Sequence, residues 1–114
     1  MRVLVSFGRE YRAYMEAIAS AIREFRPDTE VAVADARELE AEVERFDPEL
    51  VITSPPVTEN LLAEQLARIE LSPDTGKPSG FRVGERRWET TNPTLGEILS
   101  AVDETKSVRR QTRE

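Results

Sequence analysis

Two short polar segments of the sequence carry the residue types that bind small anions. Each segment directly follows an apolar run, at residues 3–5 and at residues 50–52. Backbone N–H groups at the start of a helix, an arginine and neighbouring hydroxyls together can hold a phosphate or sulfate. The candidate ligand-binding residues are Ser6, Gly8, Arg9, Glu10, Thr53 and Ser54. The alternative interpretation is that the two serines cap helices and that the arginine pairs with an acid.

A second candidate lies later in the chain, at Arg86, Arg87 and Trp88. Arginine and tryptophan are enriched among the residues that dominate protein interfaces, and a hairpin at the edge of a sheet leaves backbone groups open to another strand. This stretch therefore predicts a contact with a protein partner or with a second copy of the chain, as in a homodimer. In the alternative interpretation, Trp88 covers the core and the arginines face solvent.

The residue types also limit the chemistry. The chain has no cysteine and no histidine, which excludes a disulfide, a Cys/His zinc site, a thiol nucleophile and a Ser-His-Asp triad. The remaining acid–base candidates, Glu10, Glu59 and Lys77, form no recognisable constellation. Gly8 alone is no dinucleotide fingerprint, and its loop has no P-loop lysine. We therefore predict no catalytic residue, metal or cofactor, and enzyme activity is not expected.

The elements that position these residues follow from hydrophobic periodicity. Apolar runs at residues 3–5, 31–34 and 50–52 are typical of buried strands. Between them, residues 10–26 and 35–46 show the apolar spacing of amphipathic helices. Strands alternating with helices predict a parallel sheet, and the family resemblance given below implies that its strand order starts 2-1-3. In that order the two polar segments meet where the strand order reverses, which is where ligands bind in open α/β sheets.

The second half of the chain follows another pattern. Residues 58–66 predict a short third helix, and Ile69 and Leu71 alternate with polar residues as in a strand with one wet face. Gly84 lies at the first turn position between runs at 81–83 and 86–88, which predicts a type II′ hairpin. In the last helix we expect Asn92 as the cap and Pro93 at the first position.

The predicted fold is an α/β three-layer sandwich, with a parallel sheet, which the family resemblance given below implies is flavodoxin-like, and an antiparallel hairpin near the C-terminus. We expect a single domain over residues 1–104 and a basic, disordered tail over residues 105–114, which has almost no apolar content.

Charge and hydropathy limit the partners and the location. The chain has 16 lysine and arginine residues against 22 aspartates and glutamates, and the net charge is −6. An acidic protein of this kind is not expected to bind nucleic acid, since phosphate contacts need a basic face. No apolar run approaches a membrane span of about 20 residues, and none resembles a signal peptide. A cytoplasmic protein without a membrane partner is therefore predicted.

Residues 2–54 resemble the first half of response-regulator receiver domains, which have a flavodoxin-like fold. The resemblance rests on the run Arg-Val-Leu-Val at residues 2–5, the helix at residues 10–25, and the run Asp-Pro-Glu-Leu-Val-Ile-Thr-Ser at residues 47–54. Matched to the family, the phosphoacceptor position falls on Ser54, and Glu10 is the only acid near the place of the family's acidic pair. Lys77 is followed by proline, as the family lysine is, but it lies in a loop.

The resemblance implies a pseudo-receiver, a non-catalytic regulatory or protein-interaction module. The alternative is a binder of a small anionic or phosphorylated ligand between strands 1 and 3. A degenerate phosphorelay receiver that uses Ser54 is a third interpretation.

Overall fold

A computed structural model describes the backbone of residues 1–54 and 64–113, and side chains as far as Gln111. The strands are β1 (Arg2–Phe7), β2 (Glu30–Asp35), β3 (Leu50–Thr53), β4 (Ala67–Glu70), β5 (Pro78–Val83) and β6 (Arg86–Thr91). The helices are α1 (Arg12–Phe25), α2 (Leu39–Phe46) and α4 (Leu95–Arg113), with 3-10 turns at Arg9–Tyr11 and Ala36–Glu38. The helix predicted over residues 58–66 lies almost wholly outside the described residues.

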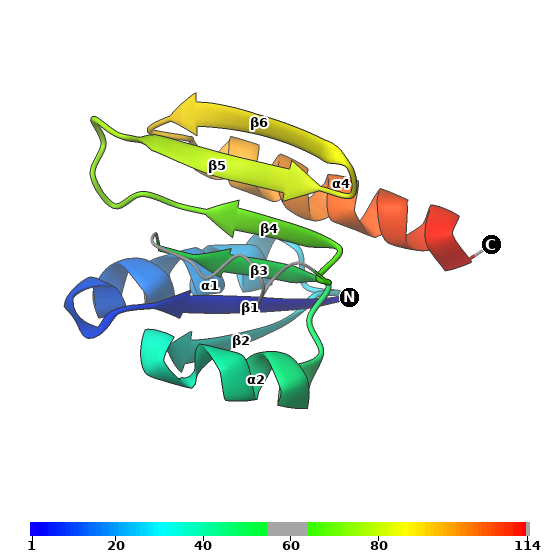
Figure 1. The fold of residues 1–114 in the computed structure, drawn as a ribbon, viewed down its shortest axis with the longest axis horizontal. Helices are drawn as coiled ribbons and strands as arrows, with labels where there is room; N and C mark the ends of the chain where they lie inside the picture. The colour runs from blue at the N-terminus through cyan, green and yellow to red at the C-terminus, as the bar shows by residue number, and fades with distance from the viewer. Residues whose placement is uncertain (55–63, 114) are drawn as a thin grey trace.

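The strands form one mixed sheet in the order β2-β1-β3-β4-β5-β6 (Figure 1). β1, β2, β3 and β4 pair in parallel, whereas β5 and β6 pair antiparallel. The predicted start of the order, 2-1-3, is therefore present, together with the C-terminal hairpin. From β5 onward the sheet departs from a flavodoxin-like sheet. Only residues 71–77 connect β4 to β5, and a parallel crossover needs roughly a dozen residues or more.

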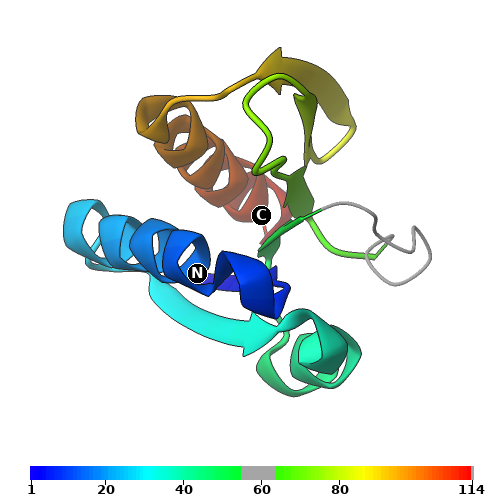
Figure 2. The same ribbon diagram turned by 90° about the vertical axis from the view of Figure 1, so that its left-hand side faces the viewer.

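Helices lie on both faces of the sheet, but they cover them unequally. α1 and α4 pack on one face against side chains of β1 and β5, including Val3, Val5 and Phe81. α2 packs on the opposite face, against Leu4 and Val51. Figure 2 shows α1 and α4 on one side of the sheet and α2 on the other. Among the described helices, none packs on the β4–β6 part of the face that carries α2.

The hairpin between β5 and β6 has the predicted turn. Val83 lies opposite Arg86, so Gly84 and Glu85 form a two-residue loop. Gly84 has φ +60°, and Glu85 has no positive φ, as a type II′ turn requires. This turn fixes which residues of the two strands lie opposite each other.

The cap of α4 differs from the predicted one. Asn92 has φ 51° and lies before the helix. Thr94 makes the capping contacts: its Oγ1 accepts from the Glu97 amide at 3.1 Å, and its amide donates to the Glu97 carboxylate at 3.2 Å. This reciprocal pair is a capping box, and its Thr-x-x-Glu pattern is visible in the sequence. The prediction of Asn92 as the cap is therefore wrong.

The predicted tail also differs from what is observed, since α4 continues to Arg113. Thr105 is fully buried and donates to the Ala101 carbonyl at 2.7 Å. Lys106 contacts Asp28 at 2.8 Å, and Arg109 contacts Glu49 at 3.0 Å. These tertiary ion pairs hold a segment whose own apolar content is low, so local composition could not reveal them.

No described helix is both long and apolar enough to cross a membrane.

Candidate functional site

The carboxyl ends of β1 and β3 bring together two of the predicted ligand-binding residues. Ser6 lies directly opposite Thr53, and both side chains are buried. Because side chains alternate along a strand, both point to the face that carries α2. Among the described residues the Ser6 hydroxyl has no hydrogen-bond partner, and the Thr53 hydroxyl makes one long contact, to the Ser54 carbonyl at 3.5 Å.

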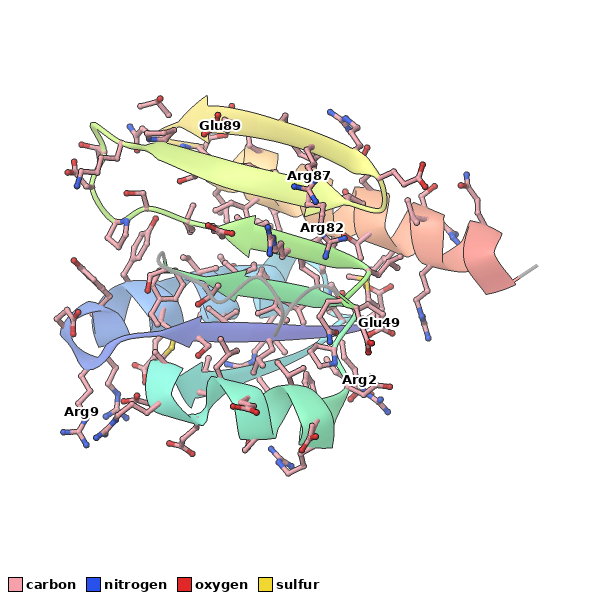
Figure 3. The ribbon with its side chains drawn as sticks, viewed as in Figure 1. Arg2, Arg9, Glu49, Arg82, Arg87 and Glu89 are labelled. Carbon is pink, nitrogen blue, oxygen red and sulfur yellow. The ribbon has the colours of Figure 1, made fainter. Side chains whose placement is uncertain are left out.

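The charged members of the predicted set lie elsewhere. Arg9 extends toward β2, on the opposite side of β1 from β3, where its Nε lies 3.6 Å from an Asp35 carboxylate oxygen (Figure 3). This ion pair is what the alternative interpretation expected. The Glu10 carboxylate folds back over Gly8, where a Cβ atom would lie 3.1 Å from its oxygens. A negative group thus lies over the backbone predicted to hold an anion.

Arg9 borders a hollow of about 670 Å³ between α1, β2 and α2. The wall charges are compensated: Asp35 accepts from the Arg37 amide at 2.9 Å and lies near both Arg9 and Arg37. The amide hydrogen bond is the largest cause of the lowered Asp35 pKa, and the two arginines add to it. Two further ion pairs, Arg12–Glu16 and Arg45–Glu42, lie along the wall of the same hollow. These contacts order the hollow's rim and leave its arginines engaged with acids.

The predicted interface residues of the hairpin divide between the two faces of the sheet. Trp88 stacks on Phe81, with ring centroids 5.1 Å apart, and packs against the core beside α4. Arg86 lies 4.1 Å over the Trp88 ring and forms an ion pair with Glu104 of α4. Trp88 therefore covers the core edge, as its alternative interpretation expected.

Arg87 points to the opposite face, where it completes a row of arginines across three strands. Arg68 of β4 lies opposite Arg82 of β5, which lies opposite Arg87 of β6. The next row on this face is Glu70, Gly80 and Glu89. Figure 3 shows Arg82, Arg87 and Glu89 on the face turned away from α4. The two rows line a shallow hollow of about 360 Å³.

The central arginine of this row is held firmly, and the outer one is free to bind. Arg82 donates to the Gln65 carbonyl at 2.8 Å and to the Gly84 carbonyl at 3.3 Å. Burial lowers the Arg82 pKa, and the charges of Arg68 and Arg87 lower it further. Arg87 is exposed, and in the described part of the chain it has no ion-pair or hydrogen-bond partner.

Sequence reasoning missed most of this surface. The Gly84 turn already predicts that Arg82 lies opposite Arg87 and that Gly80 lies opposite Glu89, because it fixes the register of the hairpin. Arg68 and Glu70 could not be placed in these rows from the sequence, since the pairing of β4 with β5 does not depend on a tight turn. Glu89 in particular was recoverable, because it is two residues from Arg87 on the same face.

Comparisons with protein-family models, with curated proteins and with solved structures find no match to this chain. In the structure, Ser54 directly follows β3, the place that the receiver resemblance gives to the phosphoacceptor. Within residues 1–54 and 64–113, no three acidic side chains come together as a metal site would need.

Proposed function

We propose that this protein is a non-catalytic, receiver-like regulatory module that binds a protein partner through its β5–β6 hairpin. The observation that carries the proposal is the position of β6. In the described sheet β6 pairs with β5 alone, so one of its edges presents unpaired backbone N–H and C=O groups. Its exposed side chains include an arginine and a glutamate, Arg87 and Glu89, which can select a partner by charge.

The opposite edge of the sheet is less available. There the Arg23 guanidinium of α1 donates to the Val31 carbonyl of β2 at 2.9 Å. A side chain bonded to an edge strand blocks the addition of another strand, which is one way in which proteins protect such edges. Among hydrogen bonds between described residues, none brings a side chain to the backbone of β6. The hairpin edge is thus the more open of the two.

The receiver-like part of the proposal rests on which residues replace the family's chemistry. An aspartyl phosphate needs a carboxylate acceptor and a neighbouring acidic pair that holds Mg²⁺. Here Ser54 has the acceptor position, Glu10 folds over Gly8, and Asp35 accepts from the Arg37 amide. A regulatory role without phosphotransfer fits these residues. The flavodoxin-like sandwich and the cytoplasmic location stay predictions within this proposal.

One observation favours the second candidate function, a binder of small anions between β1 and β3. Ser6 is fully buried there, and its hydroxyl has no partner in the part of the chain that the structure describes. An unpaired buried hydroxyl is costly and is often explained by a ligand or an ordered water. Arg9 weakens this candidate, because it reaches toward Asp35 on the other side of β1.

Amide chemical shifts measured by NMR can test the proposal against both phosphotransfer and anion binding. The ¹⁵N-labelled protein is titrated with Mg²⁺ and beryllofluoride, which mimics an aspartyl phosphate, and separately with sulfate. We expect no saturable shift of the Ser6, Thr53 or Ser54 amides in either titration. A Mg²⁺-dependent shift with beryllofluoride would contradict the proposal, and a saturable shift with sulfate would favour the anion site.

A further inference from the structure

The free edge of β6 presents the backbone groups of alternate residues. In a two-residue hairpin the pair that closes the turn is hydrogen-bonded, here Val83 with Arg86. Hydrogen-bonded pairs then recur at every second residue, so Arg86, Trp88 and Thr90 bond to β5. The backbone groups of Arg87, Glu89 and Thr91 therefore point away from the sheet.

A second copy of β6 could add to this edge antiparallel in only a few registers, because outward-facing residues must pair with outward-facing residues. In one register, Arg87 of one copy lies opposite Arg87 of the other, so two positive charges face each other. In another register, Glu89 of one copy lies opposite Glu89 of the other, so two negative charges face each other. In the register between these, Arg87 of each copy lies opposite Glu89 of the other, and Trp88 lies opposite Trp88. Opposite charges stabilise directly opposed cross-strand pairs and like charges destabilise them.

We propose that two copies of this chain associate through β6 in the register centred on Trp88, forming one continuous sheet with two Arg87–Glu89 pairs across the interface. This inference rests on the proposed function, whose unspecified protein partner it identifies as a second copy. The association has two-fold symmetry, and both copies use the same surface.

The charges of the neighbouring strands support the same register. On each copy the Arg68–Arg82–Arg87 row lies beside the Glu70–Gly80–Glu89 row. In the proposed sheet the arginine row of one copy continues into the glutamate row of the other. Within one copy, Arg82 and Arg87 are like charges directly opposite each other. The second copy brings a carboxylate to the free side of Arg87.

The helices leave room for this association. α4 packs behind β5, and β5 of one copy would lie three strand spacings from β5 of the other. At about 4.8 Å per spacing the two helices are roughly 14 Å apart. Packed helices need about 8–10 Å between their axes, so the two copies of α4 do not collide. β6 also has no proline and, in its register with β5, no bulge that would obstruct strand addition.

Charge-swap variants in sedimentation equilibrium test the proposal. The wild-type chain is compared with Arg87→Glu, with Glu89→Arg, and with an equimolar mixture of the two. Each variant alone places like charges at both cross-strand pairs, whereas the mixed pair restores both opposite-charge contacts. Glu44→Arg is the control: it changes the charge as Glu89→Arg does, and Glu44 lies exposed on α2, away from β6. Thermal unfolding checks that every variant is folded.

We expect wild type and Glu44→Arg to dimerise, each single β6 variant to dissociate about tenfold more readily or worse, and the mixture to recover most of the affinity. A wild-type chain that stays monomeric up to about 1 mM would overturn the proposal. So would dimerisation that neither β6 variant weakens, or a mixture no better than its components. These failures would leave the non-catalytic module standing, because the beryllofluoride and sulfate titrations test that separately.

Discussion

At the scale of single residues, the buried hydroxyl of Ser6 is the clearest departure from ordinary packing. A buried hydroxyl without a partner costs about 1–3 kcal/mol. We therefore predict that Ser6→Ala raises the free energy of unfolding by about 1 kcal/mol, since alanine removes the unpaired group and leaves only a small void. Urea unfolding followed by circular dichroism measures this directly.

Thr53→Ala is the matched comparison for that prediction. Thr53 lies opposite Ser6 and is equally buried, but its hydroxyl has a contact to the Ser54 carbonyl and its methyl group fills space. We expect Thr53→Ala to destabilise. A Ser6→Ala variant that loses 1 kcal/mol or more would show that the Ser6 hydroxyl is bonded in solution, which would strengthen the anion-binding alternative.

The start of α4 gives a second prediction at this scale. Thr94→Ala removes the hydroxyl that accepts from the Glu97 amide, and should lower the free energy of unfolding by about 1 kcal/mol. Asn92→Gly should change it little, because glycine adopts the positive φ of this position without strain. If Asn92→Gly costs more than Thr94→Ala, the assignment of the cap to Thr94 is wrong.

At the scale of elements, α4 is fastened to the loop after α1 by two ion pairs. Arg26 binds both carboxylate oxygens of Asp103, at 2.7 and 2.8 Å, and Lys106 contacts Asp28. The hydrogen bond from Arg26 is the largest cause of the lowered Asp103 pKa, and the bond from Lys106 lowers that of Asp28. The Lys106 contact lies in the part of α4 that was predicted to be a disordered tail, and the Arg26–Asp103 pair lies just before it.

The pH dependence of stability follows from these lowered pKa values. A carboxyl whose pKa is lower in the folded state stabilises above its unfolded pKa and loses that contribution as the pH falls through its folded value. We expect stability to be steady near neutral pH and to fall below about pH 4. Asp103→Asn should cost about 0.5–1 kcal/mol at pH 7, since the pair is partly exposed, and should reduce the loss on acidification. An acid profile identical to wild type would contradict this.

The elements also show how far the sequence could be interpreted. The apolar runs of β1 and β3 and the periodicity of α1 predict the parallel half, because burial on both faces of a strand leaves an unbroken apolar run. The Gly84 turn predicts the hairpin and its register. The length of α4 was missed because its second half has few apolar residues and is held by buried Thr105, by Val108 packed on the core and by tertiary ion pairs. Arg9 was expected between β1 and β3 but lies toward β2, because the carboxylate that attracts it, Asp35, is at the end of β2.

At the scale of the whole molecule, the sheet has two unlike ends. At the β2 end, arginines pair with acids and one bonds to the strand's backbone. At the β6 end, Arg68 and Arg86 pair with Glu70 and Glu104, but at the open edge Arg87 and Glu89 have no ion pair with another described residue. An exposed arginine and glutamate at an open edge become favourably paired when a second copy places the opposite charge beside each of them. We infer that the molecule is built to associate at one end.

Hydrogen exchange of the β6 amides, followed by NMR at low and high protein concentration, tests this association most directly. The Trp88 and Thr90 amides bond to β5, so their exchange should be slow and nearly independent of concentration. The Arg87 and Glu89 amides point outward, so we predict fast exchange in dilute protein and at least tenfold slower exchange in concentrated protein. If the Arg87 and Glu89 amides exchange at the same rate at every concentration, no second strand adds to β6 and the central claim fails.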